Sequence, residues 1–427
     1  MKKAIIVLFS IFFLGCKSEK KSNQDISKER PNILFVIADD MGKDAIAGFT
    51  EGTIKPHTPN LDFIRKNGLN FNNFWTYPTC SPTRASMITG KYGYRTDVRW
   101  ANQKLNENEL LLQKYINNNT NNSYATAVVG KWHISGYDTT INPETFGIDY
   151  YAGIFIGSVK DYYNWPLSEN GQTTISTEYT TKKFTDLATN WIQKQEKPWF
   201  MWLAYNAPHT PFHAPPTKMH SQGHLPPYNK DADPMPYFMA SIEAMDYQIG
   251  KLLNSLSENE RKNTVIIFIG DNGTEPVVTQ APYDKNQVKR SIYQGGINMP
   301  LFISGKGVSR KGFDNNLITS SDIFATIAEI AGVELEEIND SKSFKYLLTK
   351  KKSIRKFQYS EMKNDKKNAW TISNGTYKLI VFANGIKELY NLSIDPYEKE
   401  NILKSVLNNK EERAKLELET ELLKIRN

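Results

Sequence analysis

The sequence predicts an α/β fold in which helices flank a central, mostly parallel sheet, followed by a small C-terminal α+β subdomain with an antiparallel sheet. Short apolar runs alternate with segments of helical periodicity, which is typical of a parallel sheet covered on both faces. Polar residues follow several of these runs, as expected where ligand groups gather at the carboxyl ends of strands. From about residue 340 the chain becomes rich in lysine and loses the alternation, which indicates a domain boundary.

The N-terminal residues have the features of an export signal. Lys2 and Lys3 precede an apolar run of about eleven residues, which is too short to span a bilayer and suits a secretory signal. The run ends at Gly15-Cys16 and resembles the lipoprotein box of bacteria, which implies cleavage before Cys16 and lipidation of that cysteine. An ordinary signal peptide with an incidental cysteine, or an uncleaved anchor, would also fit.

We therefore expect a lipoprotein signal peptide at 1–15 and a charged, flexible tether at 16–30. The protein is then exported and anchored by lipid to the bacterial membrane, at the periplasmic face or the cell surface of the outer membrane. About 400 residues remain, which suits one large domain and a smaller one. The formal net charge of +7 would favour a polyanionic partner, but scattered solvated lysines explain it better, so the charge carries little weight. We expect no nucleic-acid partner.

The elements of the large domain, expected at 31–345, follow from apolar runs and helical periodicity. The run NILFVIA at 32–38 is continuously apolar, as in strands that are buried on both faces. The same pattern predicts strands at 125–129, 199–204 and 264–269. Between them, the periodicity predicts helices at 85–89, 180–195, 236–256 and 320–331.

The C-terminal subdomain, expected at 346–427, contains a predicted antiparallel meander followed by a charged amphipathic helix. The turn pairs Asn374-Gly375 and Asn384-Gly385 are typical of tight hairpins. The predicted strands lie at 369–377, 378–383 and 386–392, and the helix lies at 410–426.

Two pairs of polar residues follow predicted strands and indicate a cation site. Asp39 and Asp40 come directly after the first strand, where adjacent carboxylates repel unless they are neutralised. Asp271 and Asn272 follow the strand at 264–269. Three carboxylates and one amide oxygen suit a hard cation, Ca²⁺ first and Mg²⁺ second. Each pair alone would also fit a turn that ends a strand and caps a helix.

The run PTCSPTRASMITG contains Cys80 and Arg84 on a predicted loop punctuated by proline. A lone thiol with an arginine four positions later indicates a nucleophile, although a buried structural cysteine is the common alternative. The run resembles the type I sulfatase signature C-x-P-x-R-x-x-x-x-T-G. The resemblance implies that a maturation enzyme converts Cys80 to formylglycine, an aldehyde whose hydrate attacks sulfate esters.

Further motifs extend this resemblance from about residue 30 to residue 401. It implies an alkaline-phosphatase-like fold for the large domain. Asp39, Asp40, Asp271 and Asn272 match the family's metal ligands, and the modified Cys80 is a further ligand.

The remaining motifs carry the residues expected to bind sulfate and transfer protons. Lys131 and His133 lie in G-K-W-H, and His209 lies in A-P-H-T-P. The resemblance gives Lys131 and His209 contacts with sulfate, makes His209 the acid that protonates the leaving alcohol, and makes His133 the base that regenerates the aldehyde. Lys289 matches the family's lysine before Y-E-G-G, and His213 is a further candidate in the substrate cleft.

The lysine motif departs from the family in one respect. Gln294 stands where the family usually has glutamate, which puts a local hydrogen bond or ion pair in doubt. Lys285 in the same loop competes with Lys289 for the role of the sulfate-binding lysine.

The resemblance implies a sulfuric ester hydrolase, and export suggests a sulfated carbohydrate as its substrate. The alternatives are a phosphonate monoester hydrolase or phosphodiesterase of the same superfamily, or a glycan-binding lipoprotein that is never activated. Candidate sugar subsites are the aromatic stretch 150–165 with Arg95, Arg99, Trp100 and His213, although core packing and loop surface explain these residues equally well.

Overall fold

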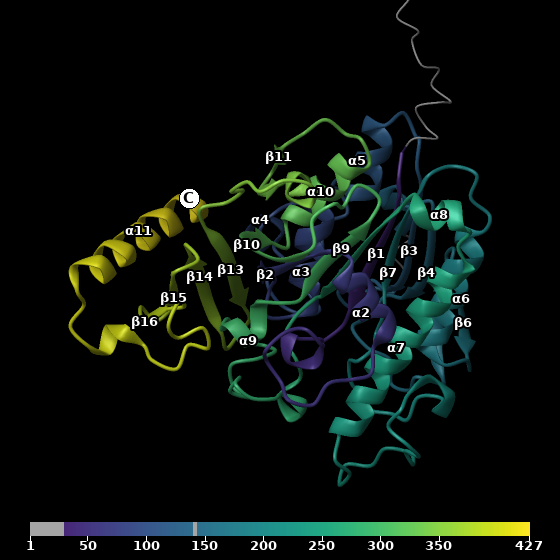
Figure 1. Ribbon diagram of the computed structural model, residues 1–427, viewed down its shortest axis with the longest axis horizontal. Coiled ribbons are helices and arrows are strands. Elements are labelled where there is room, and N and C mark those ends of the chain that lie inside the picture. Colours follow the sequence, from purple (N-terminus) through teal and green to yellow (C-terminus); the bar gives the residue numbers. More distant parts are fainter. Residues whose placement is uncertain (1–29, 140–142) are drawn as a thin grey trace, which may run out of the picture.

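The computed structural model describes residues 30–139 and 143–427 (Figure 1). The expected signal peptide, the tether at 16–29 and Cys16 lie outside the described residues. A ten-stranded sheet forms the centre of the large domain, in the order β10-β2-β9-β8-β1-β7-β3-β4-β5-β6. The strands β1, β7, β3, β4 and β8 pair in parallel, and β9, β5 and β6 run antiparallel to their neighbours. The predicted α/β class with a mostly parallel sheet is confirmed.

The four predicted strands are the central ones. β1 (Asn32–Ala38) and β7 (Trp199–Ala204) have the predicted bounds, whereas β3 (Ala125–Lys131) and β8 (Thr264–Gly270) extend further. All four are almost wholly buried, because helices cover both faces of the sheet. The other strands of this sheet are β2 (Leu69–Trp75), β4 (Tyr150–Ile154), β5 (Trp165–Glu169), β6 (Gln172–Ser176), β9 (Leu301–Gly305) and β10 (Gly312–Thr319).

Alternate residues of β1 pack into two separate helical layers. Ile33 and Phe35 pack in the layer of α3, α5 and α10, whereas Leu34 and Val36 pack in the layer of α2, α6 and α7.

Among the described residues, no helix is long and apolar enough to cross a membrane. The helices of the large domain are α2 (Pro59–Lys66), α3 (Cys80–Thr89), α4 (Gly93–Thr96), α5 (Leu112–Asn119), α6 (Thr180–Ile192), α7 (Met235–Ser255), α8 (Glu258–Lys262), α9 (Gln294–Ile297) and α10 (Asp322–Ile330).

One predicted helix begins earlier than expected. The sequence places Cys80 on a loop and starts the helix at residue 85, whereas α3 begins at Cys80 itself. Pro82 lies in the first turn, where its missing N–H removes no helical hydrogen bond. The helix ends at Gly90, whose φ of 70° is left-handed and favours glycine.

The C-terminal sheet has four antiparallel strands in the order β13-β14-β15-β16, covered by α11 (Asn409–Arg426). The predicted meander is present. Its first predicted strand, at 369–377, wrongly continues through the Asn374-Gly375 turn, and the sequence did not predict β13. Asn408 and Glu411 form a capping box that starts α11. The strands are β13 (Gln358–Lys363), β14 (Asn368–Ser373), β15 (Tyr377–Phe382) and β16 (Lys387–Asn391), and a separate small ribbon pairs β11 (Glu337–Ile338) with β12 (Ser341–Lys342).

Candidate active site

Four adjacent strands deliver polar residues to one edge of the sheet. β8, β1, β7 and β3 are neighbours, and their carboxyl ends lead to Asp271, Asp39, His209 and Lys131 respectively. The backbone at Asp40 is left-handed, with a φ of 65°. This conformation costs an aspartate on the order of 1 kcal/mol or more, and its presence beside a carboxylate cluster is typical of a functional site.

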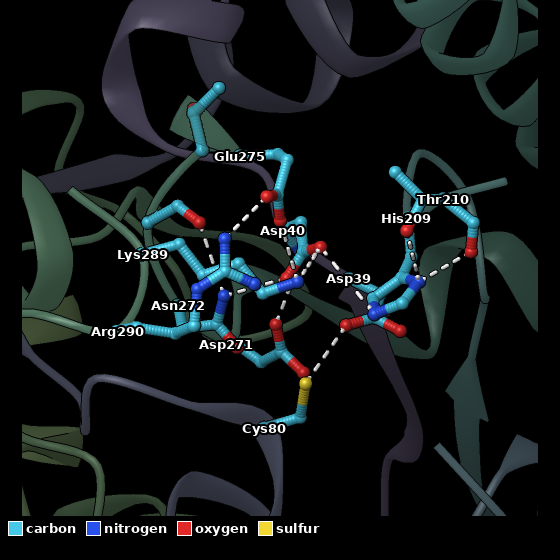
Figure 2. Close-up of polar contacts among 12 residues, drawn as sticks. Asp39, Asp40, Cys80, His209, Thr210, Asp271, Asn272, Glu275, Lys289 and Arg290 are labelled. Carbon is cyan, nitrogen blue, oxygen red and sulfur yellow. Dashed lines mark hydrogen bonds and ion pairs between the residues drawn. The ribbon is translucent and has the colours of Figure 1, made fainter. Parts of the chain in front are cut away.

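Cys80 lies within this cluster (Figure 2). Its Sγ is 3.3 Å from Asp39 Oδ1 and 3.2 Å from Lys131 Nζ. Lys131 Nζ also donates to Asp39 Oδ2 at 2.5 Å, and all three side chains are buried. Burial and the neighbouring Asp39 raise the pKa of the Cys80 thiol well above its usual value, and burial raises the pKa of Asp39. An unmodified thiol here therefore stays protonated and is a weak nucleophile.

Asp40 is the point at which the other functional groups meet (Figure 2). Lys289 Nζ contacts Asp40 Oδ2 at 2.5 Å, His209 Nε2 lies 3.6 Å from the same oxygen, and Asn272 Nδ2 donates to Oδ1 at 2.7 Å. Burial raises the pKa of Asp40, but Lys289 and His209 outweigh burial and hold it well below its usual range. Asp40 is therefore ionised at any pH at which the protein works.

Arg84 does not contact the Cys80 sulfur directly. Its guanidinium binds Asp271 Oδ2 through Nε at 3.2 Å and Nη2 at 2.8 Å, and it donates to the Lys131 carbonyl at 2.6 Å. Burial and the nearby Asp39 raise the pKa of Asp271 to about 6, although Arg84 and Lys131 oppose this. The structure thus gives Arg84 a positioning contact with Asp271 and the end of β3.

The donor atoms of this cluster fit a hard divalent cation. Asp39, Asp40, Cys80 and His209 each offer one ligand atom, and these atoms lie within 4.8 Å of one another. Asn272 Oδ1 is buried and has no hydrogen-bond partner, although Asn272 Nδ2 is bonded. A buried amide oxygen without a partner costs about 1–3 kcal/mol unless a cation or water satisfies it. Three of the five predicted metal ligands, Asp39, Asp40 and Cys80, lie in this cluster with His209, and the other two, Asp271 and Asn272, contact Asp40 beside it.

His133 is oriented by a residue that the sequence analysis missed. Its Nε2 lies 2.8 Å from Asn102 Oδ1, so the proton belongs on Nε2, and the buried Nδ1 has no partner. Burial and the charge of Lys131 lower the pKa of His133 well below its usual value. The side chain is therefore neutral, with a free basic nitrogen at Nδ1.

The other two predicted histidines have different surroundings. His209 Nδ1 donates to the Thr210 carbonyl at 2.6 Å, which leaves Nε2 on the side of Asp40. Burial lowers the pKa of His209 to about 4, although Asp40 opposes this. His213 stacks on Tyr162 with ring centroids 3.7 Å apart and lies 3.1 Å from the Tyr179 hydroxyl. It is not among the residues that line the pocket beside Cys80.

A pocket of about 240 Å³ opens onto Cys80, His133, His209 and Lys289. Of the candidate sugar subsites, Trp100 lines this pocket together with Gly157 and Ser158 from the stretch 150–165. Arg95 and Arg99 instead form ion pairs with Asp340 and Asp97. Lys285 is exposed on the loop, whereas Lys289 is buried in the cluster, so Lys289 is the lysine of this loop that reaches the site.

Two residues that contact the predicted site residues were not predicted from the sequence. Glu275 binds Lys289 Nζ at 3.0 Å, and its place three residues after Asn272 could have drawn attention to it. Asn102 has no motif around it, and only the folded loop places it against His133.

The comparison with protein families agrees with this geometry. A model described as Sulfatase matches residues 31–333, which is more than half of the chain. The chain belongs to the sulfatase family. A second model, described as the C-terminal part of N-sulphoglucosamine sulphohydrolase, matches residues 283–427 of this sulfatase.

Among curated proteins, this sulfatase is 25% identical to the arylsulfatase of Klebsiella aerogenes over 438 residues, covering 78% of this chain and 92% of that enzyme. It is 26% identical to the ulvan-active sulfatase of Formosa agariphila over 361 residues, covering 78% and 68% of the two chains. These relatives and the family match identify it as a sulfatase enzyme.

Among solved structures, the crystal structure of Ps i-CgsB superposes with a TM-score of 0.78 at 26% identity and covers 92% of both chains. The same protein in complex with k-i-k-neocarrahexaose gives a TM-score of 0.76 at 25% identity, again with 92% coverage of both chains. The superposition confirms the predicted alkaline-phosphatase-like sulfatase fold.

Proposed function

We propose that this sulfatase removes sulfate from a sulfated carbohydrate, using a formylglycine at position 80 and a bound Ca²⁺ ion. The observation that carries the proposal is the position of Cys80 Sγ, 3.3 Å from Asp39 and 3.2 Å from Lys131 on the wall of a pocket. Position 80 thus adjoins both the candidate metal site and the ammonium group of Lys131, which attracts an anionic ester.

Formylglycine supplies an aldehyde hydrate, in which one hydroxyl attacks sulfur and the other allows sulfate to be expelled afterwards. The C-S-P-T-R run around Cys80 matches the family signature for this conversion, which supports a formylglycine at position 80. Asp39, Asp40, Asn272 and the modified position 80 would hold the cation, and its chemistry is to neutralise charge at the reacting oxygens. Asp271 adds a third carboxylate beside Asp40.

Ca²⁺ is preferred to Mg²⁺ because the ligands come from separate strand ends and are mostly carboxylate and amide oxygens. Four carboxylates face four cations, so the formal charges of these side chains balance; the pairs involve Asp39, Asp40, Asp271 and Glu275 with Lys131, Lys289, Arg84 and Arg290. A divalent cation makes the site positive, and an anionic sulfate ester then binds favourably.

Lys131 and Lys289 are the groups that stabilise the sulfate charge. Both ammonium groups are buried, and both have a raised pKa because Asp39 and Asp40 outweigh the effect of burial. They are therefore fully charged at neutral pH and are held in place by buried carboxylates. Fixed cations in such a site stabilise the charge of the transition state more than they would in water.

His209 and His133 carry the proton transfers. His209 is neutral in the free protein, and the negative charge of a bound sulfate ester raises its pKa, so that Nε2 can protonate the leaving alcohol. His133 Nδ1 is an unprotonated nitrogen held in place through Nε2, as a base that takes a proton in the second half of the reaction requires.

Two observations support a carbohydrate substrate. The relatives include an ulvan-active sulfatase and a sulfatase solved with k-i-k-neocarrahexaose. Trp100 lines the pocket beside Cys80, and an aromatic ring is a suitable platform for the apolar face of a sugar.

The proposal is tested by mass spectrometry of the peptide that contains residue 80, on protein produced with and without a formylglycine-generating enzyme. We expect an aldehyde and release of sulfate from sulfated oligosaccharides only with that enzyme. Cys80→Ala should abolish turnover and leave the unfolding transition in place. An active Cys80→Ala variant contradicts the proposal, and faster turnover of a matched phosphonate ester favours a phosphonate monoester hydrolase instead.

We also propose that the sulfatase is exported and anchored through a lipid on Cys16, with domains at 31–345 and 346–427. The lipoprotein-like run before Cys16 and the separate C-terminal sheet support this. Cys16→Ala should move the protein from the membrane fraction to the soluble fraction of cells without changing its specific activity. Unchanged membrane association of this variant contradicts the anchor.

A further inference from the structure

A long groove runs between the edge of the ten-stranded sheet and the C-terminal sheet. Its larger part, the basic arm, has a volume of about 1220 Å³ and is lined by Arg310, Lys351, Lys352, Arg355 and Lys356. Its smaller part, the aromatic arm, has a volume of about 400 Å³ and is lined by Phe49, Tyr283, Phe313 and Tyr397. The two arms are adjacent, because Asn73, Phe313 and Gly375 line both of them.

We propose that this groove is a second, non-catalytic binding site for sulfated polysaccharide. The inference rests on the proposed function in taking the ligand to be a polymer of the same class as the substrate.

The lysines of the basic arm are not neutralised by their surroundings. Lys351, Lys352 and Lys356 are exposed, and none of them forms an ion pair within residues 30–139 and 143–427. Lys352 Nζ lies over the Tyr346 ring, 5.3 Å from its centroid. Three exposed ammonium groups without ion-pair partners among the described residues therefore line the groove, and they attract a polyanion at moderate ionic strength.

Two carboxylates line the basic arm, and one of them, Asp314, is paired with a cation. Asp314 accepts from Arg310 at 2.7 Å, and Glu417 accepts from the Asn374 amide at 3.0 Å. Arg355 contacts the buried Asp322 at 2.5 Å. The two arginines are thus held by their own partners, and the three lysines supply the excess positive charge.

The aromatic arm offers the other half of a sugar site. Phe313 lies on the edge strand β10 and is 44% exposed, with its ring 5.5 Å from that of Phe49 in an edge-to-face arrangement. Asn298 lines the same arm, and its side-chain Oδ1 has no hydrogen-bond partner among the described residues. Apolar sugar faces stack on exposed rings, and sugar hydroxyls pair with amides, so the two kinds of group together suit a carbohydrate.

The groove is separate from the catalytic pocket but adjoins the same loop. None of the residues that line the groove also lines the pocket at Cys80. Tyr283 and Gln294 line the aromatic arm, whereas Lys289 and Arg290, between them in sequence, line the catalytic pocket. One polymer chain held in the groove therefore keeps its sulfate groups close to the catalytic loop.

The test compares two triple variants in a Cys80→Ala background, so that the probes are not hydrolysed. The first is Lys351→Ala, Lys352→Ala and Lys356→Ala. The control is Lys194→Ala, Lys197→Ala and Lys262→Ala, which removes the same charge from exposed lysines near α6 and α8, at the opposite end of the molecule (Figure 1). Binding of ι-carrageenan, chondroitin sulfate and unsulfated chondroitin is measured by isothermal titration calorimetry at two salt concentrations.

We expect the first triple variant to weaken binding of both sulfated polymers about five- to tenfold at low salt, with less loss at high salt, because screened charges contribute less. The control variant should keep the affinity of the parent protein. Phe313→Ala should weaken the sulfated and unsulfated polymers alike at both salt concentrations. Equal loss in the two triple variants, or no loss in the first, overturns the proposal.

Turnover measurements on the same lysine variants in the active protein separate this inference from the proposed function. In the active background, turnover of 4-nitrophenyl sulfate reports on the catalytic pocket alone, and turnover of sulfated polymer reports on both sites. Normal binding in the groove without sulfate release from any carbohydrate contradicts only the proposed substrate. Sulfate release from polymer with unchanged KM in the first triple variant contradicts only the groove.

Discussion

At the scale of single residues, the orientation of each side chain in the site depends on its hydrogen-bond partner. The motif G-K-W-H made Lys131 and His133 visible in the sequence, and the structure places both beside Cys80 or its pocket. The orientation of His133 could not be predicted, because it depends on Asn102, a residue 31 positions away on a loop without a motif. Likewise, Arg84 was visible, but its contact with Asp271 appears only when α3 meets the end of β8.

Asn102→Ala is expected to lower kcat about 10- to 100-fold, because His133 loses the acceptor that fixes its tautomer. Asn102→Asp keeps the acceptor and should retain most of the activity. His133 works as a base only when unprotonated, so kcat falls as the pH drops through its lowered pKa. The carboxylate of Asn102→Asp raises that pKa, and the acidic limb of the pH profile should shift to higher pH. An unmoved limb would count against His133 as the base.

Asp271→Asn is expected to reduce the Ca²⁺ content of the purified protein from stoichiometric to trace amounts and to abolish activity with it. The substitution removes one carboxylate from the cation site while keeping its shape. It also leaves the buried Arg84 without its ion-pair partner, so we expect a loss of stability of about 3 kcal/mol. Metal analysis and denaturant unfolding measure the two effects. Unchanged calcium content would argue against Asp271 as part of the site.

At the scale of elements, the sequence predicted the central strands and missed those toward the edges. β1 and β8 are continuous apolar runs, because both of their faces are covered. β2 reads LNFNNFW and resembles a turn region, yet it pairs with the edge strand β10. Asn72 donates to Asn315 Oδ1 at 2.7 Å, and Asn73 donates to the Asn315 carbonyl at 2.9 Å. These amides are satisfied by a strand more than 200 residues away, which local patterns do not reveal.

Gly157→Ala tests how closely the segment after β4 approaches the site. A Cβ at position 157 would lie 2.5 Å from Cε1 and Nε2 of His133, so the ring must move. We expect kcat to fall at least about tenfold, since small misplacements of catalytic groups cost that much or more. Steady-state kinetics and thermal unfolding measure the outcome.

Gly171→Ala is the matched control for this substitution. A Cβ there meets nothing within 4 Å, but the φ of 78° makes the position unfavourable for alanine. This variant should therefore lose about 1 kcal/mol of stability and keep its kcat. If Gly157→Ala behaved in the same way as Gly171→Ala, the contact with His133 would have no catalytic importance.

At the scale of the whole molecule, the C-terminal sheet supports the loop that carries Lys289. Lys378 on β15 is fully buried, forms a 2.5 Å ion pair with Glu398 and donates to the Ile292 carbonyl at 2.8 Å. Glu398 accepts in turn from the backbone N–H of Gln294. The expected effect of glutamine at position 294 is thus small, because the contact with Glu398 uses the main chain.

Lys378→Met is expected to destabilise the protein by about 3 kcal/mol at pH 7, because it leaves the buried Glu398 without a counter-charge. Burial already raises the pKa of Glu398, and loss of Lys378 raises it further. A carboxyl group with a raised folded-state pKa binds its proton more tightly when folded, so the variant should become more stable as the pH falls toward 5. Denaturant unfolding at several pH values measures this.

The double variant Lys378→Met, Glu398→Gln serves as the control for charge. It should recover most of the stability at pH 7 and lose the pH dependence, because no buried charge remains unpaired. We expect KM to be higher than in the wild-type protein in both variants, because both lack the Lys378 contact with the Ile292 carbonyl that supports the loop from Lys289 to Gln294. Wild-type KM in both would show that the C-terminal sheet does not position Lys289.

The burial of Cys80 fixes the order of events in the biogenesis of this sulfatase. The side chain is only 3% exposed, and its neighbours come from β1 and β3, which are far from it in sequence. A separate protein cannot bind residues 80–84 once β1 and β3 have folded against them. The conversion of Cys80 to formylglycine, as proposed above, would therefore have to precede folding, and a molecule that folds first would keep its thiol. Under that proposal, the yield of active enzyme depends on the relative rates of modification and folding.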